Sequence, residues 1–319
     1  MTRLCSAILL QVFSVAFSAA GLSLEDWGTL FKPNTACEVR WEASTNQLPK
    51  TVWVYKIVPS QFPPAVISNV MALGGYSLSN RTNIEGRPFS KDIFHFRSPD
   101  GVGYLTYAPK YGVIDYLDDT ARAKMMEYAE SVPGDSEATR LALNWVEKLG
   151  LNRSQLSTQP GSSELRTYKG IRERGRAGKK EPISRDVYFI RQVDGIDLAG
   201  IGNYGGVHIA FGDRGKVAEL QLLWPNLERH KEHLVASASR VGEWIKQGRA
   251  VITGPNTATV LASAPQLKSL TVKKITPLYL GTSIMDEPKE FVHPFAELEV
   301  IANLGHTNLP VILNCPVAD

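Results

Sequence analysis

Two histidines on separate predicted strands are the side chains most suited to acid–base chemistry. His95 lies in the segment DIFHF and His208 in the segment VHIAF. An imidazole titrates near neutral pH and can act as a general acid or base when a carboxylate orients it. Asp194, Asp197 or Asp115 would supply that carboxylate if both histidines face one cavity. The alternative for each histidine is a half-buried side chain with a structural hydrogen bond.

Aromatic residues gather around the same predicted strands. Most of them belong to the core, but a minority could line an apolar ligand cavity between two lobes. The predicted pocket residues are Tyr104, Tyr107, Tyr188, Tyr204 and Trp224. A closed pocket that also contains a histidine or an aspartate would favour an enzyme, whereas a packed core under a flat sheet would favour a binding module.

Motifs for metals and cofactors are absent from the sequence. His230 and His233 are three residues apart at the start of a predicted helix, a spacing at which two imidazoles can share one metal. No third ligand is evident, so an exposed polar face is favoured and no metal site is predicted. The chain has no GxSxG, HExxH, Walker or dinucleotide-binding pattern. We therefore expect no cofactor.

The first twenty residues resemble a secretory signal peptide. Arg3 precedes a short apolar run, and small residues follow it up to a cleavage site expected near Ala20. The run is too short for a typical membrane-spanning helix, and no later segment is apolar for 18 residues. We expect a secreted or extracytoplasmic protein without a stable membrane anchor after cleavage.

The expected extracytoplasmic location permits a disulfide bond and N-glycosylation. Cys37 and Cys315 are the two cysteines of the mature chain, and an isolated pair in an oxidising compartment favours a disulfide. The alternative is two separate buried thiols. Asn80 and Asn152 begin N-glycosylation sequons in polar stretches, so both are candidate glycosylation sites.

The charge pattern argues against a nucleic-acid partner. The chain carries a formal net charge of only +3, and 43% of its residues are hydrophobic, which is a normal globular balance. Positive charges concentrate in residues 157–185, a segment rich in Ser and Gly. We interpret this segment as a flexible charged loop. A basic arm for an acidic partner and a protease-sensitive site at Lys179–Lys180 are the alternatives.

The remaining pattern predicts an α+β fold with mainly antiparallel sheets and packed helices. Short turns rather than helical crossovers separate most strands. The predicted strands are 51–58, 92–96, 102–107, 112–116, 186–193, 196–198, 207–211, 216–224, 272–280 and 291–304. The predicted helices are 64–73, 135–149 and 229–246. We expect a signal peptide over 1–20, one lobe over 21–156, the charged loop over 157–185 and a second, similar-sized lobe over 186–319.

Residues from about 135 to 304 resemble the PepSY and YycI-like group of extracytoplasmic domains. In that group an Arg and a Gly on one strand precede an apolar strand, a Gly turn and a long strand that ends in Trp. The matching positions here are Arg191, Gly195, Gly215 and Trp224. The charged insertion at 166–181 departs from the pattern, and the N-terminal third is unmatched. The resemblance implies a binding or inhibitory module rather than an enzyme.

The sequence thus predicts a secreted binding or regulatory module that recognises a protein or a small ligand. The alternative is a cofactor-independent enzyme, of cyclase or isomerase type, that acts on an apolar metabolite in an aromatic pocket. Such an enzyme needs no local motif, because orientation of the substrate supplies much of the rate.

Overall fold

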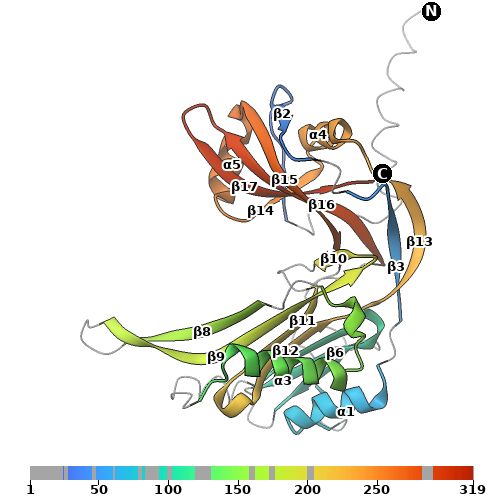
Figure 1. The fold of residues 1–319 in the computed structure, drawn as a ribbon, viewed down its shortest axis with the longest axis vertical. Helices are drawn as coiled ribbons and strands as arrows, with labels where there is room; N and C mark the ends of the chain where they lie inside the picture. Colours follow the sequence, from blue (N-terminus) through green and yellow to red (C-terminus); the bar gives the residue numbers. More distant parts are fainter. Residues whose placement is uncertain are drawn as a thin grey trace, which may run out of the picture. The chain divides into compact units, whose positions relative to one another are not determined.

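The computed structural model describes twelve stretches of the chain and confirms the predicted α+β fold with mostly antiparallel strands (Figure 1). The described residues are 24, 28–44, 48–59, 62–77, 81–82, 93–98, 103–118, 131–157, 162–171, 177–199, 205–281 and 290–318. For 81–82, 162–171 and 177–182 only the backbone is described. In this part of the chain no helix is long and apolar enough to cross a membrane. The predicted signal peptide and Asn80 lie outside the described residues.

The chain divides into two compact units, but not at the predicted border. Unit 1 combines residues 1–54, 230–278 and 289–319, and unit 2 combines 55–229 and 279–288. Three strands have residues in both units: β3 (Thr51–Val58), β13 (Asn226–Leu234) and β15 (Ser269–Leu280). Each unit is therefore assembled from segments that are far apart in sequence, instead of from the two consecutive lobes that the sequence suggested.

Unit 2 is built on one antiparallel sheet in which the strands pair in the order β4–β5–β6–β7–β12–β11–β9–β8. β10 extends from the β9 hairpin. The strands are β4 (Arg81–Thr82), β5 (Phe94–Arg97), β6 (Tyr104–Ala108), β7 (Val113–Leu117), β8 (Ser162–Ile171), β9 (Ala177–Val193), β10 (Ile196–Ala199), β11 (Gly206–Phe211) and β12 (Val217–Leu223). Short 3-10 turns lie at η5 (Pro109–Tyr111), η6 (Arg153–Gln155) and η7 (Asp213–Gly215).

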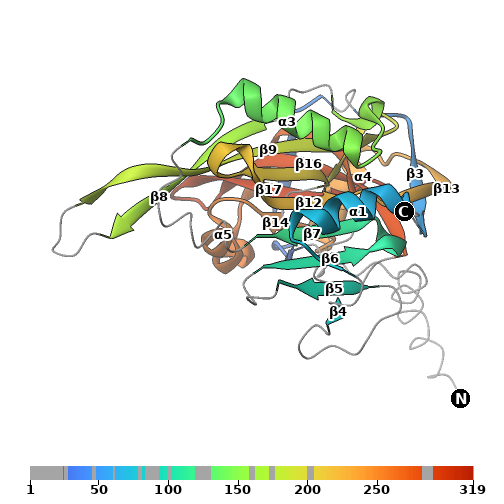
Figure 2. The same ribbon diagram turned by 90° about the horizontal axis from the view of Figure 1, so that it is seen from below.

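Two helices cover one face of this sheet, as Figure 2 shows. Helix α1 (Pro64–Leu73) begins with a proline at its first turn, where the missing N–H is not needed, and ends at Gly74. Helix α3 (Asp135–Lys148) has acidic residues in its first turn and a lysine in its last, as the helix dipole favours. Both helices pack apolar side chains on one row of the sheet: Phe189, Val207, Leu222, Ile114, Tyr107 and Phe94.

Unit 1 contains a second sheet with short helices. β1 (Thr29–Phe31), β14 (Ala250–Thr253), β17 (Asn308–Pro316) and β16 (Phe291–Asn303) pair antiparallel in that order. β2 (Glu38–Trp41) pairs in parallel with β15 (Ser269–Leu280). The helical segments of the unit are α4 (Ala238–Lys246), α5 (Thr257–Ser263) and the turn η8 (Ala264–Gln266).

The structure corrects two predicted elements. The described residues of 157–185 are not a loop, because β8 and the first half of β9 pair there as an antiparallel hairpin. The predicted helix over 229–246 is wrong in its first half, where β13 extends to Leu234 and is exposed along most of its length. The helix begins only after Ser237, whose hydroxyl accepts a hydrogen bond from the N–H of Arg240.

The predicted disulfide is also absent, because Cys37 and Cys315 are free and buried. The Cys37 sulfur contacts the carbonyl oxygen of Glu38, and the Cys315 sulfur contacts that of Arg249, each at 3.9 Å. Burial raises the pKa of both thiols, that of Cys315 to about 12. The alternative of two separate buried thiols describes the structure.

Candidate functional site

A row of polar side chains crosses the sheet of unit 2 on the face opposite the helices. Alternation along each strand places these residues on that face, because their neighbours in sequence belong to the apolar row beneath α1 and α3. Going from strand to strand, residues that face each other directly across the ladder are His95, Thr106, Asp115, Gln221, His208 and Tyr188. Two of the predicted catalytic residues thus share one face of one sheet.

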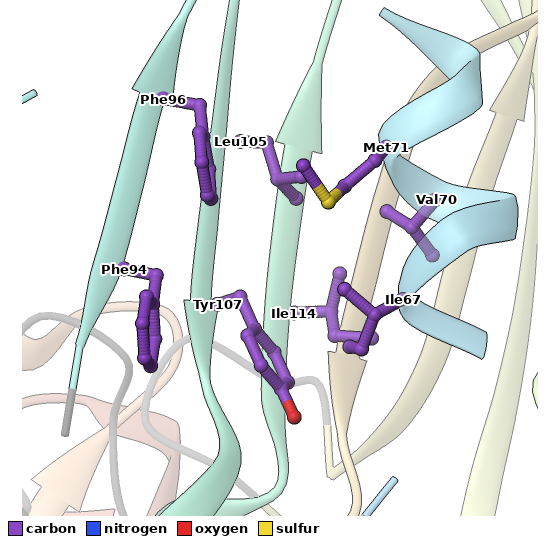
Figure 3. A pocket seen from close by; sticks show the side chains of 8 residues that line it. All are labelled: Ile67, Val70, Met71, Phe94, Phe96, Leu105, Tyr107 and Ile114. Atoms are coloured by element: carbon purple, nitrogen blue, oxygen red, sulfur yellow. The ribbon is translucent and has the colours of Figure 1, made fainter. Parts of the chain in front are cut away.

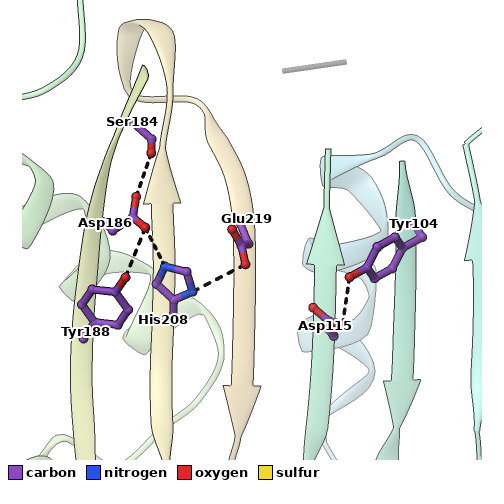
Figure 4. Close-up of polar contacts among 7 residues, drawn as sticks. All are labelled: Tyr104, Asp115, Ser184, Asp186, Tyr188, His208 and Glu219. Carbon is purple, nitrogen blue, oxygen red and sulfur yellow. Dashed lines mark hydrogen bonds and ion pairs between the residues drawn. The ribbon is translucent and has the colours of Figure 1, made fainter. Parts of the chain in front are cut away.

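His208 is the centre of a buried hydrogen-bonded group (Figure 4). Its Nε2 lies 3.2 Å from Oδ2 of Asp186, and its Nδ1 lies 3.8 Å from Oε1 of Glu219. Ser184 and Tyr188 donate hydrogen bonds to the Asp186 carboxylate at 2.8 and 3.2 Å. The Tyr188 ring stacks on the imidazole, with centroids 4.5 Å apart. His208 and Asp186 are only 2% and 1% exposed, so this group is almost completely shielded from water.

Asp115 is the second buried carboxylate of the row and is 5% exposed. Tyr104 donates a hydrogen bond of 3.1 Å to its Oδ2 (Figure 4). Burial raises the pKa of Asp115 to about 6, while hydrogen bonds from Tyr104 and Gln221 oppose this rise. At the end of the row, Nδ1 of His95 lies 2.9 Å from the Thr106 hydroxyl, and burial lowers the pKa of His95.

The register separates the two histidines too far for joint catalysis. His95 and His208 are four strand spacings apart, roughly 19 Å at ~4.8 Å per strand. A general acid and a general base must both lie within hydrogen-bond reach of one reacting group. The two histidines therefore cannot serve the same bond, and each has the hydrogen-bonded environment of a structural histidine.

The predicted carboxylate partners Asp194 and Asp197 lie elsewhere. Asp194, in the turn between β9 and β10, accepts hydrogen bonds from the Tyr55 hydroxyl and, at 2.9 Å, from the Arg229 guanidinium. Asp197 accepts one of 2.7 Å from Gln192. Both carboxylates thus orient neighbouring polar side chains. Only Asp115, among the three aspartates considered, stands in the row with the histidines.

An apolar pocket opens on the helix-covered face, between α1 and the strands β5, β6 and β7 (Figure 3). Its volume is about 150 Å³. The lining residues are Ile67, Val70, Met71, Phe94, Phe96, Leu105, Tyr107 and Ile114. The Tyr107 hydroxyl is the one polar side-chain group among them, and burial raises its pKa. The pocket is therefore suited to an apolar group.

The predicted aromatic residues do not form one pocket. Tyr107 lines the apolar pocket, whereas Tyr104 and Tyr188 lie on the opposite face beside Asp115 and His208. Trp224 lies just after β12, where its ring packs under the guanidinium of Arg191 at 4.6 Å. Tyr204 lies outside the described residues. Alternation along β6 explains the split, since Tyr104 and Tyr107 are three residues apart.

The structure also places the candidate metal ligands and the second sequon. His230 and His233 lie on β13 rather than on a helix, so their odd spacing directs them to opposite faces. The His230 ring packs on Phe291 instead, with centroids 4.9 Å apart. Within the described stretches no three His, Cys, Asp or Glu residues are placed to hold a metal. Asn152 is exposed at the start of η6.

Sequence reasoning missed Asp186 and the aliphatic pocket residues of α1, and it named Arg191 only as a position of the PepSY-like pattern. Asp186 alternates with Val187 and Phe189 along β9, a signal that could have assigned it to the polar face. Ile67, Val70 and Met71 follow helical spacing and look like ordinary core residues. The apolar pocket beside them depends on how side chains pack, which residue spacing does not predict.

Comparisons with known proteins include a distant similarity to a solved structure. No model of a protein family matches the chain, and no curated protein matches it. A solved structure of an uncharacterized protein from Eubacterium rectale ATCC 33656 is similar at a TM-score of 0.45 and 10% sequence identity, and the match covers 87% of this chain and 86% of that one. At this level of similarity the match carries no argument about function.

Proposed function

We propose that this protein is a binding module whose unit 2 takes a compact apolar group in the pocket between α1 and β5–β7. The observation that carries the proposal is the pocket itself, which is lined almost entirely by aliphatic and aromatic side chains (Figure 3). A cavity of about 150 Å³ with such a lining is of the size that holds one aromatic ring.

The lining also limits the chemistry of the ligand. Apolar surface drives its binding, because the surface of the pocket contains no polar atoms. No carboxylate, amine or imidazole lines the pocket. The ligand class is therefore a single-ring or short branched hydrocarbon group, either as a free molecule or as the end of a larger one.

The buried polar row makes binding a better proposal than acid–base catalysis. Its histidines are roughly 19 Å apart, and neither lines the apolar pocket. The resemblance to PepSY and YycI-like domains points the same way, towards binding or regulation. An extracytoplasmic location, supported by the signal-peptide pattern of residues 1–20, is part of the proposal.

Binding of toluene and indole to the mature protein tests this function. Ligands of this size bind with a dissociation constant of about 0.1–1 mM when they fill an apolar cavity. Ile67→Trp should fill the pocket and abolish toluene binding, measured by isothermal titration calorimetry. Ala72→Trp adds the same side chain to an exposed position of α1 and should leave toluene binding intact.

Two results would contradict the proposal. The wild-type protein could bind neither probe at millimolar concentration, or Ile67→Trp could bind toluene as well as Ala72→Trp does. Thermal unfolding of both variants establishes that each is folded before the titration.

A further inference from the structure

Arg191 is a buried cation, and among the described residues no carboxylate compensates its charge. Its side chain is only 6% exposed, on the helix-covered face near the end of β9. Burial is the one cause that lowers its pKa, to about 10, and no carboxylate of the described residues raises it. Buried charges in proteins are usually paired, because a charge loses its hydration when it leaves water.

The contacts that Arg191 makes with the described residues orient the guanidinium without an opposite charge. Nε donates to Oε1 of Gln155 at 3.1 Å, and Nη1 donates to the carbonyl oxygen of Pro225 at 2.5 Å. The Trp224 ring packs on the guanidinium plane at 4.6 Å. Both hydrogen-bond acceptors are neutral, and a guanidinium has five N–H donors. Within the part of the chain that the structure describes, these two bonds use two of the five donors of a guanidinium that is already oriented.

We propose that Arg191 binds the anionic group of a small ligand, a carboxylate or a phosphate, at this end of the sheet. An oriented guanidinium matches either group with two parallel N–H···O bonds. The immobilised Gln155, Pro225 and Trp224 contacts reduce the entropy lost on binding. This site is separate from the apolar pocket and does not depend on the proposed function.

A purely structural role is the competing explanation. Arg191 would then only join η6 to the chain that follows β12. A purely structural contact would stabilise the fold by the same amount whichever anion the buffer contains. Dependence of stability on the identity of the anion therefore distinguishes binding from bracing.

Thermal unfolding of the mature protein in chloride, acetate and phosphate at equal ionic strength tests the proposal. We expect acetate or phosphate to raise the melting temperature in a saturable way at millimolar concentrations, and the stronger of the two identifies the anionic group. Arg191→Lys should weaken this response about tenfold, because an ammonium lacks the bidentate geometry. Arg191→Gln should abolish it.

Arg185→Gln is the matched control on the same strand. Arg185 forms an ion pair of 2.6 Å with Asp135, so this variant loses a charge and some stability but should keep the wild-type anion response. Phosphate stabilises many proteins without binding to a site, and the comparison between Arg191→Lys and Arg185→Gln removes that contribution. If Arg191→Gln does not fold, the anion response of the melting temperature of Arg191→Lys tests the proposal. Equal melting temperatures in the three anions, or an unchanged response in Arg191→Lys, would overturn the proposal.

Discussion

At the scale of single residues, the polar side chains around Asp186 in unit 2 form hydrogen bonds with one another. Asp186 receives hydrogen bonds from Ser184 and Tyr188 and lies 3.2 Å from His208. Buried polar networks of this kind help to specify one packed arrangement, because a partner left without a bond is costly. Asp115 differs from Asp186, since its burial favours the neutral carboxylic acid.

Asp115 should make the stability of the protein depend on pH. Its pKa is about 6 in the folded protein against 3.8 for an unperturbed carboxyl. The folded state therefore holds this proton more tightly, and stability falls as pH rises from about 4 to about 6. Asp115→Asn removes this loss. We expect the free energy of unfolding of Asp115→Asn minus that of wild type to increase by about 1–3 kcal/mol between pH 4 and pH 7. Urea unfolding at each pH measures this difference.

Tyr104→Phe provides the comparison for this prediction. The Tyr104 hydroxyl lowers the pKa of Asp115. Removing this hydroxyl should raise that pKa further, so the decrease in stability should continue to a higher pH than in wild type. A difference between Asp115→Asn and wild type that stays constant over pH would contradict the account.

The sequence could place the two histidines on strands, but it could not predict how many strands lie between them. Alternation in DIFHF and VHIAF assigns His95 and His208 to polar faces. Their separation depends on strand order, in which β7 lies between β6 and β12. That pairing joins residues about a hundred positions apart, and no local pattern encodes it.

At the scale of elements, boundaries were predictable where proline and glycine set them. Helix α1 runs from Pro64 to Leu73 and strand β3 from Thr51 to Val58, as predicted. The pairing of β12 with β11 contains a register shift between Ala210 and Phe211. The β13 strand was missed because its polar, exposed residues carry no clear period.

The turn before β7 makes a second prediction, on stability. Gly112 has a φ of +65°, and a Cβ there would lie 2.1 Å from the carbonyl oxygen of Trp224. Gly112→Ala should therefore lower the free energy of unfolding by about 2–4 kcal/mol. Gly134→Ala is the control, since no atom lies within 4 Å of a Cβ at that position and its φ is −69°. Its cost should stay within about 1 kcal/mol. Equal costs in urea unfolding would contradict the turn geometry.

At the scale of the whole molecule, the predicted consecutive lobes were wrong because strands near the C-terminus pair with strands near the N-terminus. β1 pairs with β14, and β2 pairs with β15, across more than two hundred residues. Composition and spacing report local preferences, so they predicted the α+β class but not this interleaving. The apolar pocket has the same origin, since α1 reaches β5–β7 only in the folded unit.

The most direct test of the central claim is a methyl NMR titration of methionine-labelled mature protein with toluene. Met71 lines the pocket, and Met71→Leu assigns its signal. We predict a saturable shift of the Met71 methyl signal that is retained in Ala72→Trp and lost in Ile67→Trp. A Met71 signal that does not move at millimolar toluene would contradict the proposal that this pocket binds an apolar ligand.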